Sequence, residues 1–215
     1  MKTCFELKAI SASDEISTRR SCDIISRGIY STLDKAQSGM MSVIESAEKY
    51  GIGHYFGYII EEKDVDPDTP YMGFKTYRTY NSHGEPNDEC LIDYNAENSF
   101  YGRKPEDIKF SVGDIVWALQ YHELVLYVVG WLPPTTTWYQ ERKASCLKKY
   151  GNADRFYLDA TDDSYGLYTL GDGDTHCHVL CPMVFPSGKE VPEETVFQLR
   201  KKLEEMEGLT RQFLP

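Results

Sequence analysis

The sequence lacks the segments that would direct it out of the cytoplasm or into a membrane. A membrane-spanning helix needs ~20 consecutive apolar residues, and the longest apolar run, Leu124 to Leu132, is about half that length. The start, Met1 to Glu6, is of mixed polarity and contains no apolar export-signal core. We therefore expect a cytoplasmic protein with no membrane segment.

Cysteine pairs, catalytic signatures and an excess of positive charge are also missing. The six cysteines form no CxxC pair, so reduced thiols are expected. There is no GxSxG, P-loop, GxGxxG, HExxH, kinase or EF-hand pattern, and no catalytic residue is predicted. The net charge of −11, from 23 basic and 34 acidic residues, argues against a general nucleic-acid binder.

What the sequence does contain is a dense apolar stretch from Ile108 to Leu132. Val112-Gly113-Asp114 predicts a turn, and the runs Ile115 to Leu119 and Leu124 to Trp131 are rich in β-branched and aromatic residues. We interpret this stretch as the central hairpin of a small barrel or strongly bent sheet. The residues expected in or beside its buried core are Ile115, Trp117, Val125 and Val128.

The letters FSVGDIV, from Phe110 to Val116, resemble the opening of SH3-like, KOW-like and PUA/ASCH-like small β-barrels, in which a Gly-Asp turn precedes an inward-packing strand. The resemblance extends over residues 110–132. It implies a barrel that binds nucleic acid, peptides or other proteins, with no shared catalytic residues to transfer. The rest of the chain resembles bacterial or phage-borne proteins.

The pattern as a whole predicts an α+β fold with a β-β-α-β first part. Strands are expected at Cys4 to Ile10, Cys22 to Tyr30 and His54 to Ile60, with a helix from the N-cap Ser31 to Tyr50. The acidic, proline-containing stretch Glu61 to Pro70 predicts an exposed linker. We place subdomains at residues 1–63 and 71–215, with a single domain as the alternative.

The second part is predicted as a mostly antiparallel, barrel-like sheet with helices near 138–150 and 192–207. Within it, His176 and His178 are two residues apart on an expected strand and would share one face. With Asp174 as a third ligand, or Asp172 or His122 in its place, they would suit zinc. Hydrogen-bonded surface histidines are the alternative, and no other cofactor is expected.

The excess of acidic residues is concentrated in expected turns. Four aspartates represent the surface that we expect to meet a partner: Asp159, Asp162, Asp163 and Asp172. The leading hypothesis is a non-enzymatic binding protein of the inhibitor, immunity or adaptor type, with an acidic surface that recognises a basic protein. The first alternative is a small metal-dependent enzyme that uses His176 and His178.

A basic helix gives the second alternative, a nucleic-acid-binding module. The expected helix near 138–150 carries four cations beside Trp138 and Tyr139, a composition found where proteins contact nucleic acid. These cations are Arg142, Lys143, Lys148 and Lys149. A solvated helix face that neutralises neighbouring acidic loops explains the same pattern. The sequence does not predict an oligomeric state.

Overall fold

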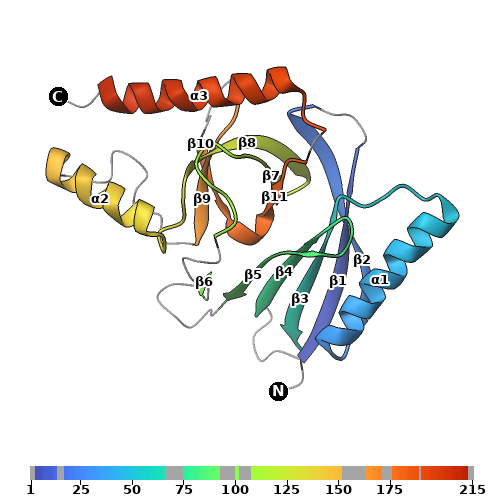
Figure 1. The fold of residues 1–215 in the computed structure, drawn as a ribbon. Helices are drawn as coiled ribbons and strands as arrows, with labels where there is room; N and C mark the ends of the chain where they lie inside the picture. The colour runs from blue at the N-terminus through green and yellow to red at the C-terminus, as the bar shows by residue number, and fades with distance from the viewer. Residues whose placement is uncertain are drawn as a thin grey trace. The chain divides into compact units, whose positions relative to one another are not determined.

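The computed structural model describes residues 3–13, 17–65, 75–92, 100–101, 108–151, 163–170, 176–188 and 190–212. The chain forms two compact units, coloured by residue number in Figure 1. Unit 1 consists of Met1–Glu15, Arg20–Gly102 and Gln120–Leu124. Unit 2 consists of Ile16–Arg19, Arg103–Leu119 and Val125–Pro215. Each unit is therefore assembled from segments that are separate in the sequence.

Unit 1 contains an antiparallel sheet in the order β2-β1-β3-β4-β5-β6. Its strands are β1 (Thr3–Ala12), β2 (Arg19–Tyr30), β3 (Gly57–Asp64), β4 (Thr76–Asn81), β5 (Pro86–Ile92) and β6 (Phe100–Tyr101). Helix α1 (Leu33–Tyr50) lies against one face of this sheet (Figure 1). The order β1-β2-α1-β3 confirms the predicted β-β-α-β beginning.

The stretch that we predicted as a linker is partly strand. β3 continues to Asp64, and Glu61 within it is buried, so an exposed loop beginning at Glu61 is wrong. Val65 is exposed, and residues 66–70 lie outside the described residues. Because β3 pairs with β4 from Gly57↔Asn81 to Glu62↔Thr76, the stretch joins two neighbouring strands. The boundary expected between residues 63 and 71 therefore falls inside unit 1.

The helical pattern of α1 is borne out by its packing. The buried side chains of the helix are Ala36, Met40, Ile44 and Ala47. They recur at the spacing that puts residues on one helix face, and the first three pack with Leu7, Ala9, Tyr58, Ile60 and Tyr80 of the sheet. The N-cap is Thr32, one residue after the expected Ser31, because the Thr32 hydroxyl accepts the Lys35 backbone N–H at 3.3 Å.

Unit 2 contains a second antiparallel arrangement, in the order β10-β9-β8-β7-β11. Its strands are β7 (Ile115–Gln120), β8 (Glu123–Trp131), β9 (Ser164–Tyr168), β10 (His176–Leu180) and β11 (Val184–Pro186). The short 3₁₀ helix η3 (Cys181–Met183) connects the two outer strands directly. Since three residues bridge opposite edges, the sheet must curl, which confirms the barrel-like α+β fold.

The hairpin β7–β8 supplies the core of unit 2, as predicted. Trp117, Val125 and Val128 are buried and Ile115 is half-buried. The inward-facing residues are Val116, Ala118, Val125, Tyr127, Val129, Tyr165, Leu167, Val179, Cys181 and Val184. Only glycine fits at position 130, because a Cβ there would overlap the ring of Tyr168.

Two helices complete unit 2, at the places the sequence indicates. α2 (Thr137–Tyr150) begins at the N-cap Thr136, whose hydroxyl accepts the Tyr139 backbone N–H at 3.2 Å. α3 (Glu193–Gln212) extends a few residues past the expected end near 207 and buries Leu199 and Leu203. None of the helices that the structure describes has the length and apolar character required to cross a membrane.

Candidate functional site

The two candidate zinc ligands lie on β10, where alternate residues face opposite ways. Cys177 and Val179 pack against the core of unit 2, whereas His178 is exposed. Asp174 and the side chain of His176 lie outside the described residues. Among the residues that are described, no group of three or more His, Cys, Asp or Glu side chains is placed to hold a metal ion.

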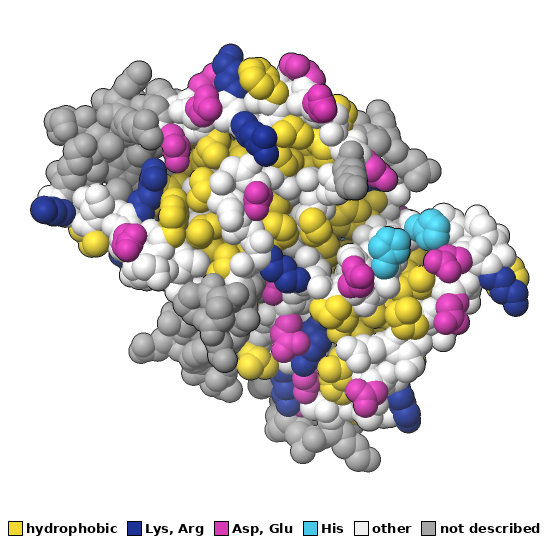
Figure 2. Space-filling view, viewed as in Figure 1, with side chains coloured by type: hydrophobic (Ala, Val, Ile, Leu, Met, Phe, Trp, Pro, Cys, Tyr) yellow, Lys and Arg dark blue, Asp and Glu magenta, His cyan; other side chains and the backbone are white. Residues whose placement is uncertain are grey.

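Of the four aspartates expected to meet a partner, the structure describes Asp163, and it is buried. Its carboxylate accepts a hydrogen bond from the Cys181 thiol at 3.8 Å, and its carbonyl accepts the Cys181 N–H at 3.1 Å. Asp159, Asp162 and Asp172 lie outside the described part of the chain. On the face shown in Figure 2, acidic side chains are interspersed with lysines and arginines, so their charges partly offset one another.

Arg142, one of the four candidate nucleic-acid contacts, is used inside unit 2. Its guanidinium carbon lies 4.7 Å from the ring centroid of Trp131 and 5.4 Å from that of Trp138, which is cation–π geometry. Its Nη1 is 3.9 Å from Glu207 Oε1. Trp131 in turn donates its Nε1–H to the Tyr168 hydroxyl at 2.9 Å. Arg142 therefore anchors α2 and α3 to the sheet.

The other three cations of this helix are described to different extents. Lys148 is exposed, Lys143 is half-buried, and the side chain of Lys149 lies outside the described residues. A phosphate-binding surface formed by all four cations stays a prediction.

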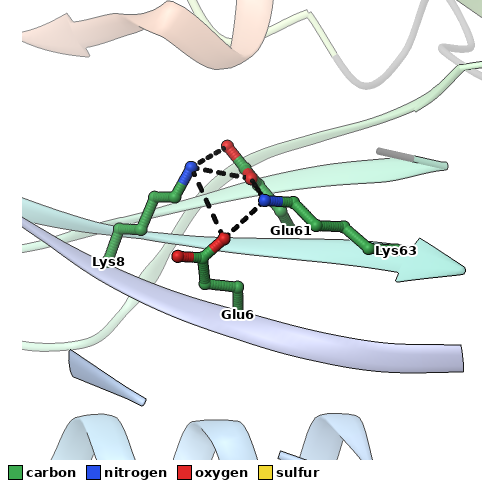
Figure 3. Close-up of polar contacts among 4 residues, drawn as sticks. All are labelled: Glu6, Lys8, Glu61 and Lys63. Carbon is green, nitrogen blue, oxygen red and sulfur yellow. Dashed lines mark hydrogen bonds and ion pairs between the residues drawn. The ribbon is translucent and has the colours of Figure 1, made fainter. Parts of the chain in front are cut away.

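A charged group that the sequence analysis missed lies on one face of the unit 1 sheet (Figure 3). The β-bridge register places Glu6 of β1 directly opposite Glu61 of β3, and like charges in that position repel. Lys8 and Lys63, each two residues further along its strand, point back to the carboxylates. Lys8 Nζ lies 2.8 Å from both Glu61 oxygens, and Lys63 Nζ lies 2.9 Å from Glu61 Oε2 and also contacts Glu6.

This charged quartet is largely withdrawn from water. Glu61 is only 5% exposed, and Tyr77 of β4 lies opposite it. Burial, together with the negative charge of Glu61, raises the pKa of Tyr77. The ion pairs of the quartet join β1 to β3. Because two carboxylates and two ammonium groups sum to no net charge, the quartet offers little to a charged ligand. In the sequence, the quartet corresponds to the pattern Glu-x-Lys, which occurs once in each of the two strands.

The quartet makes stability depend on pH. Burial alone would raise the pKa of Glu6, but hydrogen bonds from Lys63 and Ser26 and the charge of Lys8 outweigh it, so that pKa lies below 4.5. Burial alone would lower the pKa of Lys63, but Glu6 and Glu61 hold it above 10.5. A lowered carboxyl pKa stabilises the fold above the unfolded value and loses that effect as the carboxyl protonates.

We therefore expect the stability difference between the wild type and Glu6→Gln to be constant between pH 5 and 10, roughly the interval between the two ordinary pKa values. It should shrink as the pH falls below 4.5. Urea unfolding at a series of pH values measures this difference. In a Lys63→Met background, Glu6→Gln should have a smaller and less pH-dependent effect. An unchanged difference at pH 3 would contradict the role of Glu6.

The outer edge of β2 is the described feature that most resembles a binding surface. Ile24 and Ile25 are each 37% exposed and Ile29 is 71% exposed. β8 reaches this edge only at its beginning, where Cys22 N–H donates to His122 O and Leu126 N–H donates to Thr18 O, both at 2.8 Å. Beyond Cys22, none of the strands that the structure describes pairs with this side of β2.

No protein-family model, no curated protein sequence and no solved structure matches this chain.

Proposed function

We propose that the protein is a non-enzymatic binding protein that contacts another protein through the outer edge of β2. The observation that carries the proposal is the exposure of Ile24, Ile25 and Ile29 along β2, whose outer side bonds β8 at its beginning and continues past Cys22 without a partner strand in the described structure. An exposed apolar edge strand is a template for pairing with another chain, and natural proteins usually cover or charge such edges. Retaining this one is best explained by a partner that covers it.

The net charge supports a basic partner. At −11, the long-range field of the protein accelerates encounter with a positively charged surface and slows encounter with an acidic one. A cytoplasmic inhibitor, immunity protein or adaptor that covers a cationic surface would use charge in this way. Because Asp163 is buried, its carboxylate does not face such a partner. The overall charge and the β2 edge remain as the features that would attract and bind it.

The likeness to SH3-like and PUA-like barrel openings stays a proposal, and it concerns the turn before β7. Gly113 adopts a φ of 95°, and Asp114 closes the turn by donating its N–H to Ser111 O at 3.0 Å and accepting the Ser111 N–H at 2.7 Å. β7 then places Val116 and Ala118 in the core. A peptide- or protein-binding barrel is consistent with the proposed function.

The two alternatives have weaker support. The packing of Arg142 between Trp131 and Trp138 weighs against a nucleic-acid module built on α2. A metal-dependent enzyme using His176 and His178 stays a hypothesis, because its candidate third ligands Asp172 and Asp174 lie outside the described residues. Elemental analysis of protein purified without an affinity tag tests it, because stoichiometric zinc would favour the enzyme.

The proposed function is tested by capture of a partner with matched surface variants. The wild type and Ile52→Lys, which alters an apolar side chain that is 57% exposed after α1, should retain the same basic protein from source cells. Ile24→Lys/Ile29→Lys should lose it. The association rate of the purified pair should fall steeply as salt rises. Equal retention by the β2 variant would overturn the proposal.

A further inference from the structure

We infer that a second copy of this chain pairs with the β2 edge, antiparallel and centred on Ile25, so that a dimer covers the edge when no partner is bound. This inference rests on the proposed function, because it describes how the surface offered to the partner is regulated. The partner would have to displace the second copy before it could bind. The occupant follows from backbone direction, side-chain faces and charge between Asp23 and Arg27 of unit 1.

The backbone of β2 directs its hydrogen-bonding groups outward at alternate residues. Ser21 O accepts the N–H of the residue that follows β1, so Ser21 faces the β1 side, whereas Cys22 N–H donates away from β1 to His122 O. Because backbone groups alternate in direction along a strand, Ile24 and Ser26 face outward as Cys22 does. Among the described strands, none pairs with this side of β2 beyond Cys22, so both residues can bond an added strand.

Two such edges fit one another when Ile25 lies at the centre. Ile24 of one copy then lies opposite Ser26 of the other, and these outward residues exchange backbone hydrogen bonds. Ile25 meets its own counterpart as a non-hydrogen-bonded pair, in which side chains approach most closely. Ile24 and Ile25 lie on opposite faces of the sheet, and each is 37% exposed. Pairing therefore removes apolar surface from water on both faces.

The neighbouring symmetric registers lose one of these bonded pairs. A shift of the centre to Ile24 would put Ser26 opposite Cys22, whose outward N–H is already bonded. A shift to Ser26 would put Ile24 opposite Gly28, which follows an extra, bulged residue of β2 and therefore faces β1. The register centred on Ile25 uses both outward residues of each copy. Because a bulge bends its strand, each copy leaves the ladder there, before Gly28.

Charge complementarity within this register favours a second copy over an unrelated strand. Asp23 of each copy lies beside Arg27 of the other, and both residues are exposed. They share the face of Ile25, because the Arg27 guanidinium carbon lies 4.8 Å from the ring centroid of Tyr55, which packs on the α1 side of the sheet. A guanidinium stacked on a ring still presents N–H groups at its edge to a carboxylate. An ion pair therefore flanks the Ile25 contact on each side.

The net charge of the chain makes the dimer respond to salt in the opposite direction from the proposed partner. Each copy carries −11, so two copies repel at long range, and added salt screens that repulsion. Attraction between the acidic chain and a basic partner is screened by the same ions and weakens. The dimer should therefore strengthen as salt rises from a low concentration, while binding of the partner weakens.

Analytical ultracentrifugation of the full chain and two charge-reversal variants tests the pairing. Asp23→Arg alone, or Arg27→Asp alone, places like charges on both sides of Ile25 and should weaken the dimer about tenfold. An equimolar mixture of the two variants restores opposite charges on both sides and should associate as strongly as the wild type. Asp23→Arg also reduces the net negative charge, so general repulsion alone predicts a stronger dimer for that variant. A monomeric wild type, or a mixture that does not recover, would overturn the inference.

Cysteine cross-linking tests the register. Partners in a non-hydrogen-bonded pair have Cα atoms ~4.5 Å apart, which is within the range of a disulfide. Oxidation should therefore link two copies of Ile25→Cys. Ile24→Cys should link far less, because its counterpart lies two residues further along the second strand. The wild type, with its six native cysteines, gives the background, and stronger linking of Ile24→Cys would contradict the register.

The linked dimer also tests the regulation of the edge. Oxidised Ile25→Cys should retain no basic protein from source cells, and reduction should restore retention, whereas equal retention in both forms would overturn the masking. If every chain is monomeric while Ile24→Lys/Ile29→Lys still loses the captured partner, the proposed function stands and the dimer is withdrawn. If the copies pair as described but Ile24→Lys/Ile29→Lys retains the partner, the pairing stands, and the proposed function and the masking both fail.

Discussion

Trp117→Ala is expected to lower the free energy of unfolding by about 4 kcal/mol, the range for truncating a buried aromatic side chain. Trp117 is 3% exposed and lies opposite Phe185 in the β7–β11 pair. Its loss leaves a cavity beside the strand that supplies much of the unit 2 core. Chemical denaturation measures the change, provided that the unfolding slope stays constant.

A control for Trp117→Ala lies in the same hairpin. Tyr121 at the turn is 93% exposed, and Tyr121→Ala should change stability by no more than about 0.5 kcal/mol. If Trp117→Ala costs less than about 1 kcal/mol, the side chain does not belong to the core.

Glu61→Gln is expected to cost about 3 kcal/mol, near the lower end of the range for removing one partner of a buried ion pair. The substitution keeps the side-chain size but leaves Lys8 and Lys63, with side chains 22% and 32% exposed, facing a neutral amide. Their partial exposure is the reason for choosing the lower value, since water stabilises part of the uncompensated charge. Urea unfolding at pH 7 gives the measurement.

An ion pair of the same sheet whose carboxylate is exposed provides the matched control for Glu61→Gln. Glu89 lies 2.8 Å from Arg78 Nε, and its side chain is 60% exposed. Glu89→Gln should therefore cost less than about 1 kcal/mol. Adding Lys8→Met to Glu61→Gln should recover part of the lost stability, because it removes a cation that has lost its partner. Equal effects of Glu61→Gln and Glu89→Gln would show that the quartet is not a buried network.

Local features of the fold were predictable because they depend on neighbouring residues. The apolar spacing of α1, the termination of α1 at Gly51 and the turn around Gly113 all follow from interactions within a few positions. The N-cap of α1 differed by one residue, since Ser31 and Thr32 are chemically equivalent as caps. When two adjacent residues can each act as the N-cap, the sequence does not decide at which of them the helix begins.

Features that depend on strand register were not predictable. The pattern Glu-x-Lys occurs in Glu6-Leu7-Lys8 and again at Glu61 to Lys63, but only the β1–β3 register brings the four charges together. The acidic letters after Ile60 instead predicted an exposed loop, and so Glu61 was misplaced. Asp163 was misjudged in the same way, because its burial depends on Cys181, a residue that follows an entire hairpin later.

The interleaving of the two units has a consequence during synthesis. Unit 1 includes Gln120–Leu124, and unit 2 includes Ile16–Arg19 near the beginning of the chain. A nascent chain therefore cannot complete unit 1 until Leu124 has left the ribosome. Proteins of this size generally fold one domain at a time as they emerge, starting from the N-terminus. Here the first unit has to wait for Gln120–Leu124, part of a hairpin that belongs mostly to the second unit.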